Sequence, residues 1–171
     1  MSDRPLADRL EVAAPSLAAL AARLATRLPE GLRQRVLTDA FERAAAAFNR
    51  GDFEAIFTHF ADDAHYVPPP GLSAEAITGR AAVLSFWRSV SRRFTSSTIE
   101  NLSIDELTTR HFIRTARLTH RADDEVLSYV IRQTTDLRGG RVVSQINEEV
   151  TREQPMSPDG RDPLKAVGLE E

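Results

Sequence analysis

The stretch of the chain that most constrains its fold is residues 48–70, FNRGDFEAIFTHFADDAHYVPPP. It begins at the end of a predicted helix, where Gly51 can adopt the left-handed backbone conformation that terminates helices. Asp52 follows, and aspartate is a residue type that caps the N-terminus of a new helix. Three consecutive prolines, residues 68–70, end the stretch because proline cannot donate a backbone hydrogen bond to a ladder. The chain must therefore change direction at both ends of this stretch.

Between the two breaks we expect a short helix followed by a strand. Four apolar residues share one face of the predicted helix, namely Phe53, Ile56, Phe57 and Phe60. Asp62 and Asp63 are expected to close the helix, since short acidic side chains favour turns. Residues 65–67 read as extended, and their alternation predicts that one of His65 and Tyr66 points inward. Tyr66 is the better candidate, because its ring suits an apolar cavity and its hydroxyl can meet a ligand.

Two helices are predicted before this stretch, after a polar segment, residues 1–14, that we expect to be irregular. The first begins at Pro15, a residue favoured at the first helical position, and ends at residues 29–31. Its apolar stripe consists of Leu17, Leu20, Leu24 and Leu28. We expect this stripe to pack on the body of the protein or across a dimer. The second spans about residues 32–49, and its buried stripe consists of Leu37, Phe41, Ala44 and Phe48.

After the prolines, residues 72–78 are expected to form a loop and residues 79–94 a third helix. Its buried face comprises Val83, Phe86, Trp87, Val90 and Phe94. Four strands with short turns follow, at about residues 98–108, 110–121, 125–137 and 141–151. Helices first and a meander last indicate an α+β fold. We expect a cone-shaped, curved antiparallel β-sheet covered by about three helices, an extra N-terminal helix, and a cavity between helices and sheet.

Composition excludes several classes of function. The 171 residues include no cysteine, so disulfides and thiolate chemistry are absent. The net charge of −3 gives no reason to expect nucleic-acid binding, which normally shows as a stripe of basic residues. No apolar run reaches membrane-spanning length and no signal peptide is recognised, so we expect a cytoplasmic protein without a membrane partner. The four histidines, His59, His65, His111 and His120, lack metal-ligand spacing, so no metal is expected.

The order and spacing of these motifs resemble the SnoaL-like branch of the nuclear-transport-factor-2-like (NTF2-like) superfamily. The resemblance rests on residues 49–52 (NRGD), 60–64 (FADDA), 79–80 (GR) and 86–87 (FW), and on residues 140–143 (GRVV) at the start of the last strand. It covers about residues 37–151. It implies an NTF2-like, cystatin-like α+β barrel. The expected divisions are an N-terminal helical extension at 1–34, the domain at 35–152 and a tail at 153–171. The extension and the closing residues 166–169 are similar to a group of actinobacterial-type members.

The superfamily includes isomerases, polyketide cyclases, epoxide hydrolases and non-catalytic binding or dimerisation modules, so the resemblance leaves the activity open. Members like ketosteroid isomerase carry a tyrosine and an aspartate where this chain has about Ala44 and Pro68, which counts against that reaction. The Asp–Arg–Asp set of the epoxide hydrolases has no match that we can recognise among Asp136, Arg132 and Arg114. The resemblance implies no cofactor and a homodimer formed through the sheet.

Two classes of function therefore remain. The first is a cofactor-independent acid–base enzyme acting on a small hydrophobic molecule, with Asp63 or His120 as base and Tyr66 as hydrogen-bond donor. His111 and His120 lie nine positions apart on one strand, so at most one faces the cavity. The second is a non-catalytic ligand-binding or dimerisation module. In both, the candidate ligand-binding residues are Phe48, Phe60, Tyr66, Trp87, Tyr129 and Asn147. Which face of the last strand lines the cavity stays open.

Overall fold

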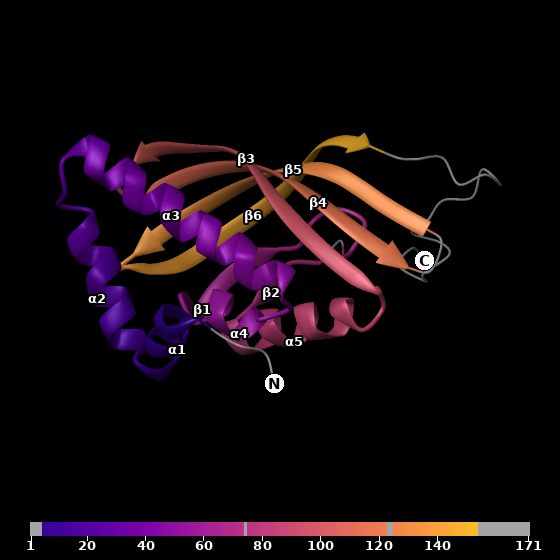
Figure 1. Ribbon diagram of the computed structural model, residues 1–171, viewed down its shortest axis with the longest axis horizontal. Helices are drawn as coiled ribbons and strands as arrows, with labels where there is room; N and C mark the ends of the chain where they lie inside the picture. Colours follow the sequence, from indigo (N-terminus) through magenta and orange to yellow (C-terminus); the bar gives the residue numbers. More distant parts are fainter. Residues whose placement is uncertain (1–4, 74, 123–124, 154–171) are drawn as a thin grey trace.

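The computed structural model describes residues 5–73, 75–122 and 125–153. Three helices come first, followed by a short helix, two strands, a fifth helix and four long strands (Figure 1). The helices are α1 (Leu6–Ala13), α2 (Pro15–Ala25), α3 (Glu30–Asn49), α4 (Phe53–Phe57) and α5 (Arg80–Ser91). The strands are β1 (Phe60–Val67), β2 (Ile77–Thr78), β3 (Ser96–Thr108), β4 (His111–Ala122), β5 (Glu125–Arg138) and β6 (Arg141–Glu153). None of the helices within the described ranges is long and apolar enough to cross a membrane.

The strands form one curved, open sheet in the order β2-β1-β6-β5-β4-β3. The four long strands β3 to β6 are antiparallel neighbours, as the meander predicts. Strand β1 joins them by pairing parallel to β6 and antiparallel to β2. The structure therefore confirms the α+β class and the cone-like sheet, and it adds one parallel pair.

Helix α3 lies across the sheet and closes the side of the cone (Figure 1). Two side chains near its ends fix it to β3. Gln34 donates to the carbonyl oxygen of Ile104, and Asn49 both donates to the Ile99 carbonyl and accepts from the Ile99 amide, at 3.1 and 2.6 Å. These bonds hold the stripe predicted from Leu37 to Phe48 against the concave face of the sheet.

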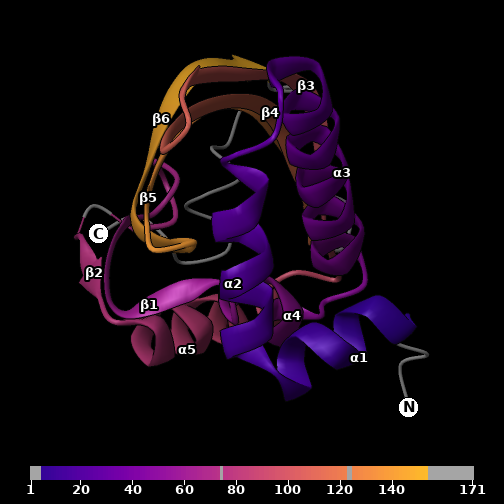
Figure 2. The same ribbon diagram turned by 90° about the vertical axis from the view of Figure 1, so that its left-hand side faces the viewer.

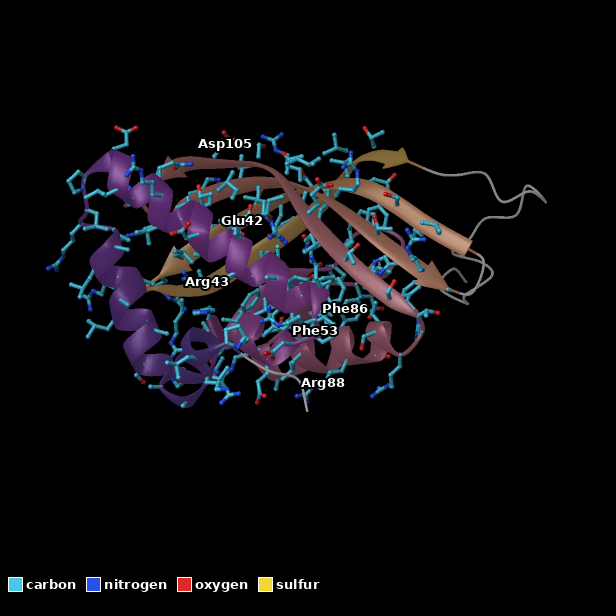
Figure 3. The ribbon with its side chains drawn as sticks, viewed as in Figure 1. Glu42, Arg43, Phe53, Phe86, Arg88 and Asp105 are labelled. Carbon is cyan, nitrogen blue, oxygen red and sulfur yellow. The ribbon has the colours of Figure 1, made fainter. Side chains whose placement is uncertain are left out.

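The aromatic core occupies the floor of the cone, between α3, α4, α5 and the sheet. The ring of Phe48 makes edge contacts with Phe53 and Trp87, at centroid separations of 5.6 and 5.0 Å. Phe53 and Phe86, labelled in Figure 3, belong to the same group, with Phe86 5.6 Å from Trp87. The predicted buried face is confirmed for Val83, Trp87 and Val90, while Phe86 is half-buried and Phe94 is buried beyond Ser91, the last residue of α5. Asp52 caps α4 as expected, accepting from the Ala55 amide.

Helix α2 stands across the open end of the cone, as Figure 2 shows. It presents its alanines inward, while Leu20 and Leu24 are 50% and 52% exposed. Leu20 and Leu24 therefore do not pack on the body of the protein, and their packing across a dimer stays a prediction. The inward face of α2 carries alanines because the backbone of another segment approaches this helix closely. The β5–β6 turn meets α2 at Gly140, where a Cβ would overlap the carbonyl oxygen of Ala19. Only small residues permit this backbone contact.

Replacing Gly140 by alanine is expected to displace α2, and Gly139→Ala provides the matched control. Both glycines have positive φ, 80° and 63°, so each alanine costs ~1–2 kcal/mol of backbone strain. Only Gly140 abuts α2, and Gly139 has open space around its Cβ position. We expect Gly140→Ala to lose a further ~1–3 kcal/mol in urea unfolding and to speed amide exchange in α2. Equal losses in the two variants would contradict the contact.

Several predictions of local structure are wrong. Asp62 and Asp63 do not close a helix, because both lie within β1. Residues 6–13 are helical, because α1 packs against α2 and α4. Residues 77–78 form a strand, because they pair with β1. Phe60 begins β1 instead of extending α4, because it pairs with Val142 of β6, whose amide donates to the neighbouring carbonyl of His59. Pairing with the last strand thus ends the helix at Phe57. Residues 154–171 of the expected C-terminal tail lie outside the described residues.

Candidate functional site

A cavity of about 280 Å³ lies beneath α2, between that helix, α3, α4 and the ends of the strands. We call it the mouth cavity. Its lining is mainly apolar, and five side chains contribute polar groups: Thr26, Arg33, Arg43, His59 and Thr109. The apolar lining includes Ala18, Ala21, Ala22, Ala25, Val36, Leu37, Ala40, Ala44, Ala47, Ala55, Ile56, Phe112 and Leu137. The alanines of α2 and α3 create this space, since their side chains end one carbon from the backbone.

A second, smaller cavity of about 50 Å³ lies deeper in the cone, and we call it the inner pocket. It adjoins the mouth cavity, because Ala44 and Ile56 line both. Its remaining lining is Phe48, Phe57, Tyr66, Pro69, Trp87, Ile99, Arg114, Leu118, Ile131, Gln133, Gln145 and Asn147. Among the described residues that line the two cavities, none is an aspartate or a glutamate.

Hydrogen bonds fix the polar side chains of the inner pocket. The indole Nε1–H of Trp87 donates to the Tyr66 hydroxyl oxygen at 2.9 Å. Gln133 donates to the side-chain oxygen of Asn147 at 2.8 Å, and Asn147 donates to the carbonyl of Val67 at 2.6 Å. Burial raises the pKa of Tyr66 well above its usual range, although hydrogen bonds and the charge of Arg114 act in the opposite direction. Tyr66 is therefore a neutral phenol at physiological pH.

Arg114 brings a positive charge into the inner pocket. The residue is only 6% exposed, and burial lowers its pKa to about 10, so it stays charged near neutral pH. Its Nη1 donates to Asn101 Oδ1 at 3.1 Å, and its guanidinium carbon lies 5.2 Å from the centroid of the Phe41 ring. Asn101 in turn donates to Glu42, an exposed residue of α3 labelled in Figure 3. The carboxylate of Glu42 thus reaches Arg114 only through an intervening amide.

The three candidate catalytic residues do not come together. Asp63 is exposed on β1 and its carboxylate lies 3.3 Å from Arg138, away from both cavities. His120 is fully buried beyond the inner pocket, bonded to Ser97 at 2.7 Å and stacked on Phe94 at 4.5 Å. Burial lowers its pKa to about 4, so it is neutral at pH 7. Tyr66 alone of the three lines a cavity.

Four of the six candidate ligand-binding residues line the inner pocket, namely Phe48, Tyr66, Trp87 and Asn147. Phe60 and Tyr129 are buried in the adjoining core and line neither cavity. On β6 it is Gln145 and Asn147 that face the pocket, which decides the open question about that strand. The prediction that Tyr66 is the inward residue of β1 is confirmed, since it is 2% exposed while His65 is exposed.

Arg114 and Gln133 were missed as site residues. Arg114 lies on the same face of β4 as Phe112, Ala116 and Leu118, and this face is buried. A charged residue at an inward position of a strand is an unusual signal, because charges are seldom buried without a partner. Gln133 is likewise a polar residue at an inward position of β5, and it is the cross-strand partner of Arg114. His111 takes the opposite parity, as predicted, and bonds Asp136 on the outer face at 2.6 Å.

Across residues 5–73, 75–122 and 125–153, no group of three His, Asp or Glu side chains is placed to hold a metal ion. The lining supplies hydrogen-bond donors within mainly apolar walls, with Arg33 and Arg43 in the mouth cavity and Arg114 in the inner pocket. Such an arrangement can desolvate a small molecule and orient an oxygen atom of it.

A curved open sheet covered by helices around an internal cavity defines the NTF2-like class of fold. The profile of the SnoaL-like domain matches residues 41–145, and the chain belongs to this family. Among curated proteins, no sequence matches the chain.

Solved structures share this fold at low sequence identity. Bal32a, from a soil-derived mobile gene cassette, superimposes with a TM-score of 0.58 at 20% identity, over 66% of this chain and 88% of its own. SalBIII, an epoxide hydrolase/cyclase-like enzyme with a role in pyran ring formation in salinomycin, gives 0.57 at 16%, over 68% and 92%. An LEH-like epoxide hydrolase of M. tuberculosis gives 0.55 at 15%, over 65% and 80%. At these identities the likeness concerns the fold alone.

Proposed function

We propose that this protein binds a small, mainly apolar molecule that extends from the mouth cavity into the inner pocket. The observation that carries the proposal is that the two cavities adjoin, with Ala44 and Ile56 lining both. The mouth cavity, about 280 Å³, is close to the lower end of the ~300–1,000 Å³ range of ligand sites. Apolar walls with a few convergent polar groups are also typical of such sites.

The polar groups favour binding and orientation of the ligand. Tyr66 keeps its proton, Arg114 keeps its charge, and Gln133 and Asn147 are held by each other and by the backbone. These side chains are pre-organised before any ligand arrives, which lowers the entropy cost of binding. A ligand with an oxygen acceptor at one end and an apolar body suits this lining.

An acid–base enzyme is the second candidate function. It is favoured by a neutral phenol and a guanidinium that line the same pocket, since such donors can stabilise a developing oxyanion. Tyr66 is the residue that we retain for this role. Asp63 and His120 are left out because neither lines a cavity. The described lining supplies no carboxylate base, so the binding function is the one we favour.

Two expectations about assembly and ancestry stay predictions. Homodimerisation through the sheet is tested by measuring the molecular mass of the protein in solution by light scattering. Placement in the actinobacterial-type group is supported by the helices α1 and α2, which precede the residues that match the family profile.

Filling the space between the two cavities is expected to weaken binding. Ala44→Leu projects three added carbons into this space, whereas Ala46→Leu makes the same change at an exposed position of α3. Thermal unfolding of the full chain would be followed with a panel of small apolar compounds that includes 2-naphthol and 1-octanol. We expect stabilisation of the wild type and of Ala46→Leu, and affinity at least about tenfold weaker in Ala44→Leu, a loss of ~1.4 kcal/mol. The proposal fails if no compound stabilises the wild type, or if the two variants respond alike.

A further inference from the structure

Arg114 is a buried cation whose nearest compensating carboxylate lies beyond an amide. Its Nε is buried and has no hydrogen-bond partner within the described residues. The phenol of Tyr66 stays neutral and so does not balance the charge. Burying a charge without a paired anion destabilises the folded state, because no direct ion pair offsets the free energy lost on desolvation. A side chain of this kind is stabilised by any anion that enters the pocket.

A second unpartnered polar atom lies on the same face of the sheet. Thr135 is 5% exposed, and its Oγ1 is buried without a hydrogen bond among the residues that the structure describes. Thr135 pairs with Phe112 across β4 and β5, while Gln133 pairs with Arg114. Arg114 and Thr135 are therefore diagonal neighbours, a separation that long side chains span. Thr135 lines neither cavity, so Arg114 is the unpartnered donor of the two that a carboxylate in the inner pocket would meet.

Charge and size narrow the identity of the anion. One guanidinium balances a single negative charge, and its planar fork suits a carboxylate. A phosphate dianion would leave one charge uncompensated. The inner pocket, about 50 Å³, has room for a group the size of one to two waters at ~30 Å³ each. It can hold a headgroup, while the apolar mouth cavity holds the body.

We propose that the ligand is an amphipathic monocarboxylate, with its carboxylate on Arg114 in the inner pocket and its hydrocarbon body in the mouth cavity. This inference rests on the proposed binding function and names the class of its ligand. The body enters beside α2, and the headgroup passes the junction at Ala44 and Ile56 before it meets the guanidinium.

The test compares octanoate with 1-octanol, which share the apolar chain and differ in charge. Calorimetric titration at pH 7 would use the full chain, Arg114→Met, and Arg117→Met as matched control. Arg117 lies on the same strand but on its outer side, with an ion pair to Glu100 at 2.7 Å. We expect the wild type and Arg117→Met to bind octanoate at least tenfold more tightly than octanol. In Arg114→Met this preference should disappear.

The outcomes separate the two proposals. Equal binding of octanoate and octanol by the wild type, or an unchanged preference in Arg114→Met, overturns the carboxylate assignment and leaves the binding function intact. Failure of every apolar compound to bind the wild type overturns both. If Arg114→Met does not fold, the test uses the wild type alone. The pKa of bound octanoate, labelled with ¹³C at the carboxyl carbon, is then measured by NMR. Its bound pKa should fall below the free value, and an unchanged or raised pKa contradicts the pairing.

Discussion

Phe48→Ala is expected to lower the free energy of unfolding by ~3–5 kcal/mol, the usual cost of truncating a buried phenylalanine. Phe48 is 7% exposed and its ring contacts both Phe53 and Trp87 edge-on. Removing the ring leaves a hole where α3 meets α4 and α5, and part of the inner pocket wall goes with it. Because domains are stable by only ~5–15 kcal/mol, this single change removes a large fraction of the total.

Urea unfolding measured by circular dichroism would check this loss. Leu32→Ala provides the control, since Leu32 lies on the same helix and is 51% exposed. We expect the control to stay within about 0.5 kcal/mol of the wild type. Similar losses in the two variants would mean that the aromatic floor is not where the stability of the fold resides.

Acid is expected to destabilise the protein through His120. Burial lowers its pKa from 6.5 to about 4, so the unfolded chain binds a proton over a pH range in which the folded chain does not. With respect to His120, the free energy of unfolding therefore has its full value above pH 6.5 and falls as the pH drops from there towards 4. Since one pKa unit corresponds to ~1.36 kcal/mol, the loss is roughly 3 kcal/mol.

Other groups also titrate in acid, so a variant must isolate the histidine. His120→Gln removes the titration, and His65→Gln makes the same change at an exposed site on β1. Between pH 7 and pH 4, the wild type and His65→Gln should lose roughly 3 kcal/mol more than His120→Gln. A parallel decline in all three proteins would show that His120 is not held neutral by burial.

Much of this fold is readable from periodicity, because its elements are long and their apolar faces regular. The stripe of α3 and the buried face of α5 are both predicted by helical spacing. The four long strands are readable because short turns with glycine or acidic residues separate alternating runs. The places where prediction fails depend on partners distant in the chain. Phe60 leaves its helix for a pairing with Val142, and residues 77–78 become a strand because β1 is beside them.

The candidate site is predictable only in part, because it depends on which face of each strand is inward. Tyr66, Trp87 and Asn147 were found by their chemistry. Arg114 was visible as a charge at an inward position of β4, yet its isolation from carboxylates is a property of the packed structure. The mouth cavity depends on the inward alanines of α2, which a search for apolar stripes overlooks in favour of the leucines. Space between small residues leaves no sequence signal of its own.

The central claim, that the cavities under α2 take up a small molecule, can be tested on a single resonance. Trp87 is the only tryptophan of the chain, and its indole Nε1–H donates to Tyr66 at the wall of the inner pocket. In a ¹⁵N–¹H spectrum its indole peak is therefore unambiguous. Titration with octanoate should shift that peak saturably in the wild type and in Ala46→Leu, and Ala44→Leu should need an octanoate concentration at least about tenfold higher for the same shift. An indole peak that does not move in the wild type, or that moves equally in Ala44→Leu, would contradict the account.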